Sequence, residues 1–130
     1  MNERTLRTTP TPTKIDLLEE ALPLVRLVLA DTPLHSVRIG ITNRLTGHGD
    51  DLETEPVVRV TAYPALGSRH ELMDVLVGEG ADLGPDGWYG NPPQADLEVR
   101  LATLAGGWPL WLRMHVSDDE WARYQRRAGE

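Results

Sequence analysis

The segment 97–116 constrains the fold more than any other part of the chain. In LEVRLATLAGGWPLWLRMHV, every second residue is apolar on both sides of a Gly-Gly pair. A period of two places successive side chains on opposite faces of a strand, so the segment predicts an antiparallel hairpin with one buried face. The opposite positions hold large or charged residues: Glu98, Arg100, Trp111, Arg113 and His115.

Two earlier segments, SVRIGITN at 36–43 and VVRVTAY at 57–63, show the same alternation. Helix starts are predicted where a serine or threonine stands three positions before an acidic residue. Three such pairs occur: Thr13 with Asp16, Ser68 with Glu71, and Ser117 with Glu120. The chain therefore predicts an α+β fold in which N-terminal, middle and C-terminal helices pack on one face of a four-stranded, mainly antiparallel sheet.

The order of these elements suggests a repeated plan. Two strands followed by a capped helix occur twice between residues 36 and 127, a ββα-ββα pattern. The pattern fits either an internal duplication or an order of elements that is common in α+β folds without duplication. Residues 1–13 are polar and interrupted by proline, so they predict a flexible N-terminal arm, while 14–130 predict a single domain.

The first helix carries more apolar residues than one buried stripe needs. Helical spacing relates five of them: Ile15, Leu18, Leu22, Val25 and Leu29. Pro23 is expected to kink or restart the helix. Three further apolar residues follow it: Leu24, Leu27 and Val28. This second half predicts either deep burial or contact with another chain.

Composition excludes several classes of function. The net charge of -7 argues against polyanion or anionic-membrane binding by the molecule as a whole. The absence of cysteine excludes disulfides, thiolate metal sites and cysteine nucleophiles. No apolar run reaches the length of a membrane span, and the N-terminus lacks the order of a signal peptide. We therefore expect a cytoplasmic protein that does not engage a membrane.

No catalytic residue, cofactor or metal is expected. The three serines are assigned as two helix caps and a strand start, and the four histidines lie in separate segments. GEGADLG does not fit a dinucleotide-binding loop, because its glycine spacing is wrong and it follows a helix. The acidic loop 47–55 matches no calcium-loop spacing, and the sequence leaves open whether it binds a cation.

If helices cover the apolar face, the opposite face collects one arginine from each predicted strand, and Glu98 is its only expected carboxylate. Three interpretations of this face compete: a solvated surface, an interface with a protein or a second copy, and a site for an anionic ligand or single-stranded nucleic acid. The aromatic pair Trp88 and Tyr89 either folds back beside Trp108 or Trp121, or anchors a partner. The candidate binding residues are Arg38, Arg59, Tyr63, Trp88, Tyr89, Arg100, Trp111, Arg113 and His115.

These observations favour a non-enzymatic binding module. Such a module would be an adaptor, an inhibitor-like partner or a subunit of a larger assembly. It would act on a protein partner or by self-association. The alternative is binding of an anionic small ligand or single-stranded nucleic acid on the same face, against which the net acidity and the single lysine argue. A third hypothesis is a small hydrolase-like enzyme in which His115 acts with a carboxylate.

Overall fold

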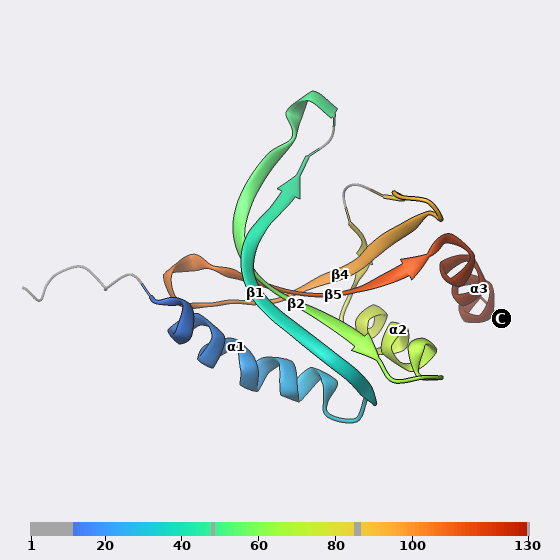
Figure 1. The fold of residues 1–130 in the computed structure, drawn as a ribbon, viewed down its shortest axis with the longest axis horizontal. Coiled ribbons are helices and arrows are strands. Elements are labelled where there is room, and N and C mark those ends of the chain that lie inside the picture. The colour runs from blue at the N-terminus through green and yellow to red at the C-terminus, as the bar shows by residue number, and fades with distance from the viewer. Residues whose placement is uncertain (1–11, 48, 85–86, 130) are drawn as a thin grey trace, which may run out of the picture.

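Two β-hairpins that meet side by side form the centre of the fold (Figure 1). The computed structural model describes residues 12–47, 49–84 and 87–129. Its elements, in chain order, are α1 (Lys14–Leu29), β1 (Leu34–Thr46), β2 (Glu53–Pro64), α2 (Arg69–Gly78), β3 (Asp82–Leu83), β4 (Gln94–Thr103), β5 (Pro109–Ser117) and α3 (Asp118–Ala128). Short 3-10 turns occur at Gly49–Asp51 and Ala105–Gly107. Of the predicted arm 1–13, only Pro12 and Thr13 lie within the described residues.

The predicted α+β class is confirmed, but the sheet has five strands in the order β1-β2-β5-β4-β3. Its central pair, β2 with β5, is parallel, whereas the other three pairs are antiparallel. The prediction of four strands was wrong because β3 has two residues and pairs only with Leu97 and Glu98. A strand that short shows no alternation in the sequence. Each hairpin is followed by a helix, so the order ββα occurs twice as the pattern indicated.

The core lies against the apolar face of β2, β4 and β5. From β5 it takes Leu110, Leu112, Met114 and Val116, the alternate positions that the sequence pattern selected. α3 joins the core through Tyr124, whose hydroxyl donates to Asp74 Oδ1 of α2 at 2.9 Å. This bond, together with burial, raises the pKa of Tyr124 to about 12, burial being the larger cause.

α1 turns a different stripe to the core than its spacing suggested. The buried residues are Leu17, Ala21, Val25 and Leu29. The helix continues through Pro23 as one element. The expectation that Ile15 and Leu22 lie on the buried stripe was wrong, because they are 68% and 38% exposed. Leu27, for which deep burial or contact with another chain was left open, is 78% exposed and so is not deeply buried. When a helix carries two apolar stripes, the spacing of the apolar residues does not show which stripe is buried and which is exposed.

Two of the three predicted capping boxes form. Thr13 with Asp16, and Ser117 with Glu120, each make both reciprocal hydrogen bonds. Ser68 makes no side-chain capping bond, so that prediction was wrong. Its backbone, at φ -108° and ψ 15°, lacks the extended conformation that directs a cap oxygen toward the first free amides of the helix.

We expect Ser117→Ala to lower the free energy of unfolding by about 1 kcal/mol, because it removes the acceptor for the Glu120 amide. Ser68→Ala is the matched control and should cost less, since no capping bond is lost. Urea unfolding of both variants measures the difference. Equal losses would contradict the assignment of the two caps.

The first hairpin is longer than predicted. Polar residues assigned to a loop continue both strands, which run to Thr46 and start again at Glu53. β2 pairs with β5 only over Val58–Thr61, so the described residues 42–47 and 49–57 form a two-stranded part of the sheet with no further strand beside it, which we call the hairpin arm. Two-stranded ribbons twist more strongly than wide sheets, and the arm turns across the direction of β4 and β5 (Figure 1).

None of the helices in the described ranges combines the length and apolar character needed to cross a bilayer. The acidic loop 47–55, for which cation binding was left open, forms the tip of the arm. Among the described residues, which leave out His48, no three metal-ligating side chains gather closely enough to hold an ion.

Candidate functional site

The site is built on the sheet face opposite the helices. Arg59 and Thr61 of β2 stand beside Trp111 and Arg113 of β5, their parallel partners in the ladder. Arg38 lies next to Thr61 on β1. The sheet therefore brings three of the predicted arginines onto one surface through its register alone.

Arg44 of the hairpin arm reaches across this face to β4. Its Nη2 lies 2.6 Å and its Nε 3.0 Å from Glu98 Oε1. Its guanidinium carbon also lies 3.7 Å from the centre of the Trp111 ring, a cation–π contact. β1 and β4 are three strand positions apart, about 14 Å in a flat sheet. The contact therefore requires the bent arm to lie over the polar face.

This covering changes the predicted surface. Glu98 is only 6% exposed, and Val57, on the same face at the base of the arm, is fully buried. Trp111 is partly buried, and its Nε1 has no acceptor among the described residues. At its centre the polar face is therefore covered by the protein's own hairpin.

Asp96 is a second carboxylate on this face, so the prediction that Glu98 is the only one was wrong. Its Oδ1 lies 2.7 Å from His115 Nδ1 and accepts a 3.0 Å hydrogen bond from the Tyr89 hydroxyl. Its Oδ2 accepts from Arg113 Nη1 at 3.0 Å. Burial alone would raise the pKa of Asp96, but the bonds to His115 and Tyr89 and the charge of Arg113 hold it below its ordinary value.

Arg59 is held differently from its two neighbours. Arg113 donates to Asp96 and also to Thr61 Oγ1 at 2.8 Å, while Arg44 is paired with Glu98. No hydrogen bond or ion pair joins Arg59 to a described residue, and its Nε is buried without an acceptor. Burial, followed by the charge of Arg113, lowers the pKa of Arg59.

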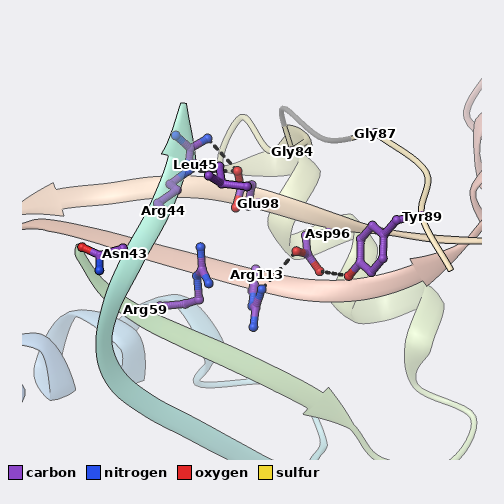
Figure 2. A pocket seen from close by; sticks show the side chains of 10 residues that line it. All are labelled: Asn43, Arg44, Leu45, Arg59, Gly84, Gly87, Tyr89, Asp96, Glu98 and Arg113. Carbon is purple, nitrogen blue, oxygen red and sulfur yellow. Dashed lines mark hydrogen bonds and ion pairs between the residues drawn. The ribbon is translucent and has the colours of Figure 1, made fainter. Parts of the chain in front are cut away.

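Arg59 borders two adjoining hollows, of which Figure 2 shows the inner one. The inner hollow, of about 200 Å³, lies under the arm and is lined by Asn43, Arg44, Leu45, Arg59, Gly84, Gly87, Tyr89, Asp96, Glu98 and Arg113. The outer hollow, of about 450 Å³, lies beside β1 and is lined by Arg38, Ile39, Gly40, Ile41, Thr42, Arg59, Thr61 and Arg113. Arg59 and Arg113 border both.

The remaining predicted residues lie around this centre. Tyr63 lies next to His115, with ring centres 6.3 Å apart. Arg100 is exposed on β4 and donates to Thr103. Trp88 and Tyr89 are 38% and 43% exposed, and the Tyr89 hydroxyl is bonded to Asp96 on the polar face.

Sequence reasoning missed Arg44 and Asp96. Arg44 lies one residue past the predicted strand 36–43, and Asp96 lies two residues before Glu98, where the predicted hairpin had not yet begun. Extending the alternation by one step in each strand would have placed both residues on the correct face. The contact of Arg44 with β4 has no counterpart in the pattern, because it depends on the bend of the arm.

Arg44→Met should lower the free energy of unfolding by about 3 kcal/mol, because it leaves the buried Glu98 carboxylate without its cation. Arg100→Met is the control on the same face and should change it by less than about 0.5 kcal/mol, since Arg100 is exposed. Urea unfolding at neutral pH measures both. Similar values for the two variants would contradict the importance of the Arg44 contact.

Asp96 should contribute to the pH dependence of stability. Its pKa is lower in the folded protein than in the unfolded chain. The stabilisation is therefore present above the unfolded pKa and is lost as the pH falls through the folded one. In Asp96→Asn, the loss of stability on acidification from about pH 5 to pH 3 should be smaller than in the wild type. Identical pH profiles from urea unfolding would contradict this role.

Comparisons with protein-family models, with curated proteins and with solved structures found no match to this chain. The function is therefore inferred from the site itself.

Proposed function

We propose that this chain is a non-enzymatic binding module that holds acidic side chains of a protein partner against Arg59, in the two hollows of the polar face. The observation that carries the proposal is the state of Arg59. Its guanidinium is partly buried and has no acceptor among the described residues, while Arg44 and Arg113 on either side are both paired. A carboxylate from outside would supply the missing acceptor.

The energetics support a role in binding rather than in folding. A guanidinium removed from water without a partner reduces stability, and residues that do so are commonly retained for function. Asp96 and Glu98 attract the Arg59 charge, but burial and the repulsion from Arg113 oppose that attraction, and both carboxylates are already bonded to other arginines. An incoming carboxylate could bind bidentately, since the guanidinium presents parallel N–H donors.

The form of the hollows favours a group on a protein surface over a dedicated small molecule. Small-ligand pockets are mostly apolar and enclose their ligand. The inner hollow is lined mainly by arginines, two carboxylates and glycines. The outer hollow is lined by arginines, threonines and Gly40, with Ile39 and Ile41 as its apolar part. Exposed aromatic residues nearby, Trp88 and Tyr89, supply the kind of rim that protein interfaces use.

Single-stranded nucleic acid is the weaker alternative. Base stacking needs an open aromatic face, but Arg44 lies over the Trp111 ring and Tyr63 is tilted against His115. A hydrolase-like enzyme is weaker still. His115 and Asp96 do pair, but the Ser117 hydroxyl beside His115 serves as the cap of α3. We propose a cytoplasmic setting, which suits a chain without cysteine.

The test is an NMR titration of protein labelled with ¹⁵N in its arginine side chains. The probe is a short peptide of alternating Glu and Thr, and its control has Gln in place of Glu. We expect the acidic peptide to shift the Arg59 Nε–H resonance and the Gln peptide to leave it unchanged. Arg59→Gln should abolish binding, whereas Arg100→Gln, on the same face, should preserve it.

Two outcomes would overturn the proposal. One is that neither peptide shifts the arginine resonances at low salt. The other is that oligothymidylate or free phosphate binds and the acidic peptide does not, which would favour the nucleic-acid or small-anion alternative. Oligothymidylate binding carried by several arginines would also fall steeply with added salt.

The same variant makes a separate prediction about stability. Without ligand, Arg59→Gln should raise the free energy of unfolding by about 1 kcal/mol, because it removes a partly desolvated, unpaired charge. Urea unfolding measures the change. A clear loss of stability would show that Arg59 serves the fold, and would contradict its assignment to binding.

A further inference from the structure

The outer edge of β1 carries no described strand. β1 stands first in the sheet order, so only its inner side is paired, with β2. A free edge presents unpaired backbone N–H and C=O groups, and natural proteins usually protect it with lysine, proline or a bulge. Residues 36–43 contain neither lysine nor proline, and the register irregularity of β1 lies before them, between Leu34 and Ser36.

An apolar groove runs beside this edge, between α1 and β1. Its volume is about 460 Å³, and the lining includes Leu22, Val25, Leu29, Val37 and Ile39. Leu22 and Val37 are 38% and 37% exposed. The groove and the free edge together offer what a strand from another chain would need, namely backbone partners and an apolar surface.

We propose that a second copy of this chain docks at this edge, by antiparallel pairing of the two β1 strands about Ile39 on a two-fold axis. In this register Ile39 faces its own copy and Val37 faces Ile41, all on the helix-covered face of the sheet. On the polar face, Arg38 faces Gly40. Apolar residues thus meet apolar residues, and each arginine meets a position without a side chain.

Neighbouring registers fit less well. A centre one residue earlier would place Arg38 directly opposite Arg38 of the second copy, a repulsive pair. A centre one residue later would place Val37 opposite Asn43. The chosen register needs only residues 36–42, so Thr42 is the one residue of the hairpin arm that takes part. A Cβ at Gly40 would meet nothing within 4 Å, so the space opposite Arg38 is open.

The charges on α1 complement themselves under the same symmetry. Ile15, Glu19, Leu22 and Arg26 form an exposed helical stripe, and Leu22 and Arg26 line the groove with Ile39. With the axis at Ile39, the two α1 helices flank it in opposite directions, near Leu22. Glu19 then faces Arg26 of the second copy, and Arg26 faces its Glu19. Neither side chain has a hydrogen bond or ion pair with a described residue.

This interface goes beyond the proposed binding of acidic groups and is separate from the paired arginines under the arm. It would join the two sheets edge to edge and place both outer hollows on one continuous face. Because Arg59 lies on β2, inside the edge, its replacement should not affect the association.

The experiment is sedimentation equilibrium of the whole chain over a range of concentrations. The wild type should reach a mass about twice 14.5 kDa. Val37→Lys and Leu22→Lys should give a monomer with an unchanged circular dichroism spectrum. Leu27→Lys is the matched control and should leave the dimer intact, because Leu27 is 78% exposed on α1 but does not line the groove.

A charge exchange tests the two-fold arrangement itself. Glu19→Arg or Arg26→Glu alone places like charges opposite each other twice, and should raise the dimer Kd on the order of tenfold. The two changes together should restore the wild-type value. A monomeric wild type, a dimer that survives Val37→Lys, or a double variant weaker than either single one would overturn the proposal. Arg59→Gln should leave the Kd unchanged, which separates this test from that of the proposed function.

Discussion

The ion pair between Arg44 and Glu98 determines the shape of the polar face. Glu98 is almost fully buried on β4, and a carboxylate in such a position requires a cation. The cation comes from the hairpin arm, which must bend over the sheet to deliver it. The same bend places the Arg44 guanidinium on Trp111 and leaves a hollow between arm and sheet. The shape of the polar face and the candidate site therefore depend on the same ion pair.

The distribution of charge under the arm then explains why Arg59 is free. Each of the two carboxylates has its own guanidinium, Glu98 with Arg44 and Asp96 with Arg113, and Asp96 is shared with His115. Arg59 is close enough to both carboxylates to feel their charges but bonds to neither. Under the arm, Glu98, Asp96, Arg44 and Arg113 are paired with one another, whereas the partly buried Arg59 is not, and the proposed anion site depends on this difference.

Local patterns in the sequence predicted much of this. Alternation placed Arg38, Arg59 and Arg113 on one face, because successive side chains of any β-strand point to opposite faces of the sheet. Alternation did not show the full length of β1, because the polar residues of the hairpin arm resemble a loop in the sequence. Arg44 lies just past the predicted strand 36–43 and was therefore missed. Nor could alternation show that Glu98 would be buried, since that depends on the arm closing from three strands away. The outcome at Ser68 shows a related limit, because the cap residues were correct and the backbone conformation was not.

The contact of the arm with the sheet is the central claim, and nuclear Overhauser effects between Arg44 and Trp111 test it most directly. A side chain 3.7 Å from the ring centre should show cross-peaks between its methylene protons and the indole protons. The same Arg44 protons should be shifted upfield by the ring current, while those of the exposed Arg38 should not. Arg44 resonances without cross-peaks to Trp111 and without an upfield shift would show that the arm does not cover the face, and the account would fail.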